Sequence, residues 1–138
     1  MNWRKIQKKY SKAFAFLIRK EMDGSEPSNI IIEFYDDEYF RYSCTIKGID
    51  NGGHGDMFTR QLYDFFDENG IPITINADYY GSMEYHPLTY SEDKADIYYW
   101  LNVNFAYEDN IEYKTRVEAE SAAFEKAFEI LENLITTQ

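Results

Sequence analysis

The chain has 138 residues, of which 44% are hydrophobic and 18% aromatic, so it can bury a sizeable core and is not expected to be disordered. Its single cysteine excludes an intrachain disulfide bond and a metal cage built from several thiolates. The net charge is −11, yet residues 1–20 carry seven basic side chains and no acidic one, whereas the rest of the chain carries all 25 acidic side chains. This asymmetry predicts either a basic arm for an acidic partner or a helix that docks on its own acidic body.

The start of the chain has a polar helical pattern in place of the apolar stretch of a signal peptide. The longest apolar run, near residues 13–18, is far shorter than the ~20 residues that cross a bilayer. We therefore expect a soluble, cytoplasmic protein that has no membrane partner.

Residues 3–20 are predicted to form one amphipathic helix, which Gly24 and Pro27 terminate. Apolar side chains recur there at the three- and four-residue spacing of one helix face, at Trp3, Ile6, Tyr10, Ala13, Phe14 and Leu17. Its lysines leave two uses open, namely contact with anionic lipid or nucleic-acid phosphates, or packing on the chain's own acidic body. We favour packing, because the apolar stripe has the length and composition of a helix that lies on a sheet.

A β-hairpin is predicted after this helix, with strands at residues 30–35 and 39–47 and an acidic turn at residues 36–38. Along the second strand, one face carries Phe40, Tyr42, Cys44 and Ile46, and the other carries Tyr39, Arg41, Ser43 and Thr45. This alternation predicts a sheet with one covered face and one wetter face. It also predicts that Cys44 is a core residue, since cysteine is among the most buried residue types.

The middle of the chain is predicted to hold a loop, a second helix and further strands. Four glycines at residues 48–55 indicate a flexible loop, after which Asp56 is placed to cap a helix over residues 57–69. Gly70 ends that helix, because glycine adopts the left-handed conformation at low cost. Strands are then predicted at residues 71–79 and 97–107, with a short paired stretch at residues 111–113.

The last helix begins at a capping box, in which the Thr115 hydroxyl and the Glu118 carboxylate each accept a hydrogen bond from the other residue's backbone amide. Its apolar stripe is predicted to comprise Val117, Ala123, Phe124, Ala127, Phe128, Leu131 and Leu134. Together the elements predict one α+β domain over residues 1–138, in the order α-β-β-α-β-β-α. We expect an antiparallel sheet of four to five strands and three helices, which lie mainly on one face of the sheet.

If the chain holds a catalytic or metal site, its candidate residues are His54, Asp56, Glu84 and His86. Each histidine lies two residues from a carboxylate in a predicted loop, which suits a general base or part of a metal site. Neither pair supplies the three or four ligands of a zinc site, and the glycines near His54 do not form a phosphate-binding motif. We therefore expect loop residues without a catalytic role, and neither a metal nor a cofactor.

Two segments, QLYDFFDENGI at residues 61–71 and TRVEAESAAFEKAFEILE at residues 115–132, are distinctive. They resemble small proteins, without an assigned activity, that phages and mobile elements of gut anaerobic bacteria carry. Those proteins typically begin with a Trp-x-x-Ile helix, which Trp3 and Ile6 match here. The resemblance implies an accessory gene, and it implies no activity, cofactor or catalytic residue.

The sequence favours a small, non-enzymatic protein-interaction module, because it lacks catalytic motifs and is rich in tyrosine, a frequent contact residue at interfaces. The expected partner is another protein or a second copy of the chain, and we do not expect direct nucleic-acid binding. One alternative is a hydrolase that uses carboxylates with His54 or His86. The other is an acidic mimic of nucleic-acid phosphates.

Overall fold

The computed structural model describes residues 1–21, 27–35, 39–46, 49–79, 97–104, 106–107 and 111–137. The helices of this part are α1 (Trp3–Lys9), α2 (Ser11–Glu21), α3 (Leu62–Glu68) and α4 (Arg116–Thr136), and a 3₁₀ turn, η1 (Thr59–Gln61), precedes α3. The strands are β1 (Pro27–Tyr35), β2 (Tyr39–Ile46), β3 (Ile49–Phe58), β4 (Ile73–Tyr79), β5 (Ile97–Val103) and β6 (Ala106–Tyr107).

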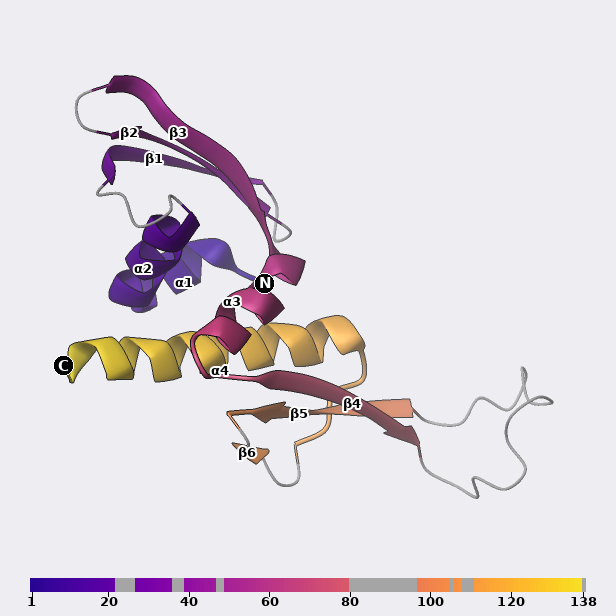
Figure 1. The fold of residues 1–138 in the computed structure, drawn as a ribbon. Helices are drawn as coiled ribbons and strands as arrows, with labels where there is room; N and C mark the ends of the chain where they lie inside the picture. Colours follow the sequence, from indigo (N-terminus) through magenta and orange to yellow (C-terminus); the bar gives the residue numbers. More distant parts are fainter. Residues whose placement is uncertain are drawn as a thin grey trace.

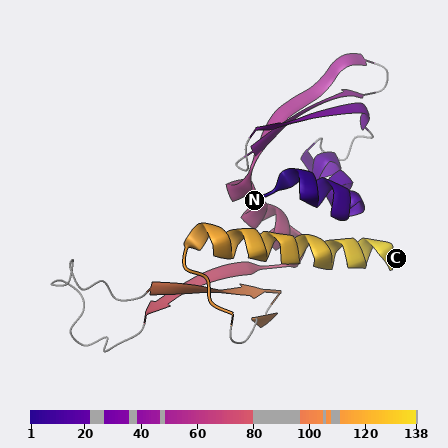
Figure 2. The same cartoon turned by 180° about the vertical axis from the view of Figure 1, so that it is seen from behind.

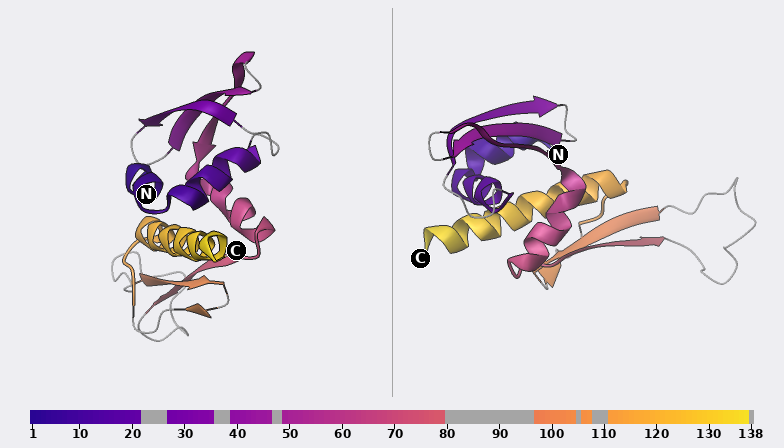
Figure 3. Two further views of the ribbon diagram at one scale, coloured as in Figure 1. Left: turned by 90° about the vertical axis from the view of Figure 1, so that its left-hand side faces the viewer. Right: turned by 45° about the horizontal axis from the view of Figure 1, so that its top comes forward.

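The strands form two antiparallel sheets, β1-β2-β3 and β4-β5-β6, which we call the first and the second sheet. Helices α1 and α2 lie against one face of the first sheet, and α4 lies between these helices and the second sheet (Figures 1, 2 and 3). The α+β class and the antiparallel pairing are therefore confirmed. The predicted single sheet is wrong, because the strands form two separate sheets. The predicted three helices and four to five strands are close but not exact, since residues 49–58 form an additional strand and the first helix is divided in two.

Strand β3 occupies residues for which the sequence predicts a flexible loop and the start of a helix. It pairs with β2, so the predicted loop at residues 48–55 is wrong over residues 49–55. Gly55 lies opposite the buried Tyr42, and a Cβ atom at Gly55 would lie 2.7 Å from the Tyr42 hydroxyl oxygen. Glycine here makes room for an aromatic ring inside a strand. Asp56 is consequently a strand residue and not a helix cap, and α3 begins only at Leu62.

The predicted helix over residues 3–20 is interrupted at Tyr10, whose φ of −123° and ψ of 57° are not helical. A carboxylate from the far end of the chain satisfies the amides at the restart. Glu132 of α4 accepts hydrogen bonds from the backbone amides of Lys12 at 3.2 Å and Ala13 at 2.6 Å, and so caps α2. The prediction of one continuous helix is therefore wrong, but the predicted apolar stripe is confirmed, since each of its residues is buried.

Helix α4 begins where the sequence predicts, and the Thr115 half of the predicted capping box is confirmed, since the Thr115 hydroxyl accepts a hydrogen bond of 3.1 Å from the Glu118 amide. The middle of its predicted stripe is buried, at Ala123, Phe124, Ala127, Phe128 and Leu131. The two ends of the stripe are wrong, because Val117 is 67% exposed and Leu134 is 48% exposed. Figure 1 shows the C-terminal end of α4 extending past the second sheet, which leaves its last turns less covered.

The second sheet confirms the predicted strand near residues 71–79 and shortens the next one. The predicted long strand at residues 97–107 ends at β5 and returns as β6 after Asn104, whose φ of 55° is left-handed. Asparagine adopts this conformation more readily than most residues. The predicted pairing at residues 111–113 is confirmed by a bridge between Tyr99 and Tyr113, which exchange hydrogen bonds of 2.7 and 2.8 Å.

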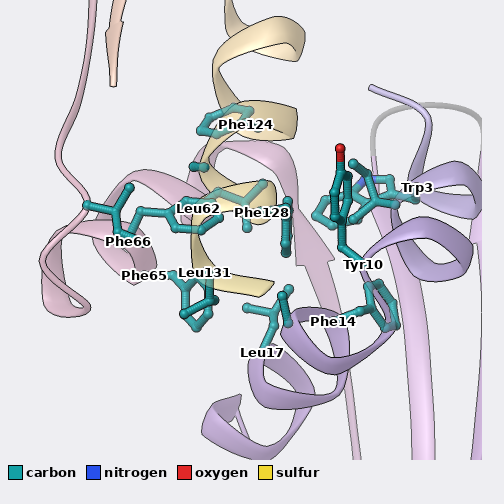
Figure 4. Close-up of a cluster of buried hydrophobic side chains, with 14 of the residues drawn as sticks. Trp3, Tyr10, Phe14, Leu17, Leu62, Phe65, Phe66, Phe124, Phe128 and Leu131 are labelled. Carbon is teal, nitrogen blue, oxygen red and sulfur yellow. The ribbon is translucent and has the colours of Figure 1, made fainter. Parts of the chain in front are cut away.

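Buried side chains from α1, α2, α3, α4 and both sheets form a hydrophobic cluster. Phe128 of α4 lies between the Trp3 ring, at 6.3 Å, and the Phe66 ring, at 5.0 Å, and meets both edge to face (Figure 4). Trp3 in turn contacts Phe40 of the first sheet, with ring centroids 4.7 Å apart. Aromatic contacts therefore link the first sheet to α4 through α1.

The basic segment docks on the chain's own acidic side chains, as the sequence analysis favours. Lys5 and Lys9 of α1 lie 3.2 and 3.5 Å from a carboxylate oxygen of Glu125 in α4. At the other end of the segment, Lys20 lies 3.9 Å from Glu68 of α3. Part of the positive charge of residues 1–20 is thus paired with acidic side chains of α3 and α4.

Replacing Lys5 by glutamine should lower the free energy of unfolding by about 0.2–1 kcal/mol, the range for a solvent-exposed ion pair. Lys8→Gln is the matched control, because Lys8 is an exposed lysine of the same helix with no Glu125 contact. Urea melts should show a larger loss for Lys5→Gln, and high ionic strength should shrink the difference by screening. Equal losses for the two variants at every salt concentration would contradict the assigned pair.

Candidate interaction surface

The face of the first sheet that points away from α1 and α2 is not covered by any helix in the described part of the chain (Figures 1 and 3). Strand alternation sends Phe40, Tyr42 and Met57 inward, where each is at most 5% exposed. The residues between them face outward. We call this side the outer face, and its described side chains are Ile31, Glu33, Tyr35, Tyr39, Arg41, Ser43, Asp56 and Phe58.

Three aromatic rings cross the outer face in register, one from each strand. Tyr35 pairs with Tyr39, and Tyr39 pairs with Phe58. The Tyr35 and Tyr39 rings are stacked at 5.0 Å with planes 7° apart, and the Tyr39 and Phe58 rings are stacked at 4.9 Å with planes 25° apart. We call these three residues the aromatic row.

Two arginines flank the aromatic row. The Arg41 guanidinium carbon lies 5.4 Å from the centre of the Tyr35 ring, and that of Arg60 lies 5.2 Å from the centre of the Phe58 ring. Both distances suit a cation–π contact. The row therefore has a cation beside each of its terminal rings.

Charged neighbours hold these groups in place. Arg41 Nε donates a hydrogen bond of 2.8 Å to Asp56 Oδ1 on the adjacent strand, and this bond raises the pKa of Arg41. The Tyr35 hydroxyl donates a hydrogen bond of 2.8 Å to Glu33 Oε2, which raises the pKa of Tyr35. The outer face thus carries both signs of charge beside its aromatic row.

A shallow hollow of about 270 Å³ continues the row beyond Phe58, toward the start of α4. Phe58, Arg60, Val117 and Glu120 are among the residues that line it. Beside it, the Tyr63 hydroxyl donates a hydrogen bond of 2.5 Å to Glu120. Burial, followed by this bond, raises the pKa of Tyr63 far above its usual range.

The structure places two of the four candidate residues, His54 and Asp56, on strand β3. His54 occupies the β3 position opposite Ser43, and Asp56 forms the ion pair with Arg41. Glu84 and His86 lie outside the described residues. Within the residues that the structure describes, no group of three or more histidine, cysteine or acidic side chains is arranged to hold a metal ion.

Cys44 is a β2 residue opposite Gly53, and its predicted burial lies outside the described side chains. The aromatic row is not predicted from the sequence as a unit, although the alternation of β2 places Tyr39 and Arg41 on one strand face. The row is missed because residues 48–55 are predicted to be a loop, so β3, the strand that carries Asp56 and Phe58, is not predicted.

Comparison with protein-family models, with curated proteins and with solved structures gave no match to this chain. Among the helices described above, none is both long enough and apolar enough to span a bilayer.

Proposed function

We propose that this protein is a non-enzymatic protein-interaction module that works in the cytoplasm and binds its partner through the outer face of the first sheet. The observation that carries the proposal is the aromatic row, stacked across three strands and flanked by Arg41 and Arg60. Tyrosine and arginine are enriched among the residues that dominate binding energy at protein interfaces. A rigid row on a sheet loses little conformational entropy when a partner covers it.

The stacking geometry favours a protein partner over a single-stranded nucleic acid. Nucleobases bind such surfaces by stacking on exposed ring faces. The Tyr39 ring is stacked between the rings of Tyr35 and Phe58, so its two faces are already in contact with neighbours. What the row offers is ring edges and hydroxyl groups. Beside them lie Glu33 and Asp56, whose negative charge opposes phosphate binding.

An accessory role in a phage or mobile element is part of the proposal. It is supported by the resemblance of residues 61–71 and 115–132 to proteins that such elements carry. A module of this kind acts by occupying a surface of another protein, for which an exposed and rigid sheet face is suited.

The proposal is tested by affinity capture with a tagged chain in the cell that encodes it. The variant Tyr35→Ser/Tyr39→Ser removes two rings of the row, and Leu134→Ser is the control, because Leu134 is an exposed apolar residue near the C-terminal end of α4 and does not line the hollow beside Phe58. The partner should be captured by the unmodified chain and by Leu134→Ser, and at least about tenfold less by the row variant. Circular dichroism should show that all three are folded. Equal capture by the folded row variant rules out the outer face as the binding surface.

A further inference from the structure

A second surface lies at the other side of β1, where the strand meets α1 and α2. A hollow of about 310 Å³ opens there, lined by Gln7, Ser11, Phe14, Ala15, Ile18 and Ile32. We call it the β1 hollow. Strand β1 is an edge of the first sheet, since within the described residues it pairs only with β2. At this edge, Ile31 is 60% exposed.

The residues that line the β1 hollow are uncharged, and two cations of α1, Arg4 and Lys8, lie within one helical turn of Gln7 in that lining. Lys5 and Lys9 turn toward Glu125 on α4, away from β1. Arg4 turns the other way, and its guanidinium carbon lies 5.0 Å from the centre of the Phe34 ring in β1. Lys8 is exposed and follows Arg4 by four residues, so the two cations share a helix face.

We propose that the β1 edge and the β1 hollow bind an extended, acidic segment of a partner protein, which adds to the first sheet as a further strand. Alternate side chains of a strand point to opposite faces. One set would enter the hollow against Phe14 and Ile18, and acidic side chains of the same segment would meet Arg4 and Lys8. Backbone hydrogen bonds supply affinity in this mode of recognition, and the pockets supply specificity.

Charge argues against a second copy of this chain as the occupant. An antiparallel pairing of two β1 edges would put α1 and α2 of both copies on the same side of the joined sheet. Arg4 and Lys8 of one copy would then approach the same cations of the other, which is unfavourable. An acidic segment matches these cations instead.

This inference rests on the proposed function only in requiring a protein partner, and it concerns a different surface. The probe is a random 12-residue peptide library displayed on phage and panned against the full chain. Selected peptides should alternate apolar and acidic residues. One of them, made synthetically with a fluorescent label, should bind with an affinity that falls as salt rises.

Ala15→Glu is the decisive variant, because Ala15 lines the β1 hollow and is exposed, so glutamate fills the hollow with negative charge and is tolerated in a helix. Val117→Glu places the same charge at an exposed helix position elsewhere. Peptide affinity should fall at least about tenfold in Ala15→Glu and in Lys8→Glu, and stay unchanged in Val117→Glu. Tyr39→Ser, which changes the aromatic row on β2 and leaves the β1 edge unaltered, should also retain it.

Three kinds of outcome overturn the inference. The first is a failure of the peptide experiment. Either the library yields no peptide or only basic peptides, or the selected peptide binds Ala15→Glu as tightly as it binds the unmodified chain. The second is a concentration-dependent dimer that Ala15→Glu abolishes, which assigns the edge to a second copy. The third is a labelled oligonucleotide that competes for the same site. In each case the proposed function would still be supported if the row variant Tyr35→Ser/Tyr39→Ser captured less partner from cells and Ala15→Glu captured as much as the unmodified chain.

Discussion

Replacing Phe128 by alanine should lower the free energy of unfolding by about 3–5 kcal/mol, the cost of truncating a buried aromatic side chain to a methyl group. Phe128 is fully buried and packs between Trp3 of α1 and Phe66 of α3 (Figure 4). The ring therefore belongs to the contacts of three helices at once. Removing it leaves a cavity that neither neighbour can fill without moving its backbone.

Urea melts followed by far-ultraviolet circular dichroism measure this loss. Val117→Ala serves as the control, because Val117 belongs to the same helix and is 67% exposed, so its truncation should change stability by less than about 0.5 kcal/mol. A loss below about 1 kcal/mol for Phe128→Ala would show that α4 does not present this face to the core.

Replacing Glu132 by glutamine should destabilise the protein by about 0.5–2 kcal/mol, the range for loss of a helix N-cap. The Glu132 carboxylate accepts hydrogen bonds from the Lys12 and Ala13 amides, where the first turn of α2 leaves its donors without intrahelical partners. Its negative charge also lies at the positive end of the helix dipole. Glutamine keeps one acceptor oxygen and loses both the charge and the second acceptor.

The matched control is Glu129→Gln, one turn earlier on α4, because the exposed Glu129 faces Lys126 at 3.9 Å and no helix terminus. Hydrogen exchange separates the two variants further. The Lys12 and Ala13 amides should exchange faster in Glu132→Gln, while amides in the middle of α4 keep their protection relative to global stability. Equal exchange at Lys12 in both variants would show that the carboxylate does not hold α2.

The elements that the sequence predicts correctly are those whose structure one local pattern decides. The stripe from Trp3 to Leu17 was found because a helix buries residues at a fixed spacing, and the Thr115 cap because its two partners are three residues apart. The interruption at Tyr10 has no comparable local signal. It depends on Glu132, which lies more than a hundred residues away in sequence.

Strand β3 and the surface it completes were missed for a related reason. In the local sequence, Gly55 indicates a turn. In the structure it is a strand residue, and it is glycine because the Tyr42 ring of the neighbouring strand leaves no room for a side chain. With β3 read as a loop, Tyr39 had no Phe58 opposite it and Arg41 had no Asp56. The alternation of β2 could therefore be predicted from the sequence. The register of β2 with β1 and β3, which brings the three strands' side chains into one surface, could not.

The cap from Glu132 also orders events during synthesis of the protein. Helices α1 and α2 leave the ribosome before α4, which carries the carboxylate that caps α2 and the Phe128 ring on which α1 packs. Until residues 128–132 have been synthesised, the apolar stripe of residues 3–17 therefore lacks these contacts. Contacts of such large sequence separation form slowly, since a long loop has to close first. The lysines that later contact α4 also give residues 1–20 a positive charge at this stage. Like charges on neighbouring nascent chains oppose their aggregation.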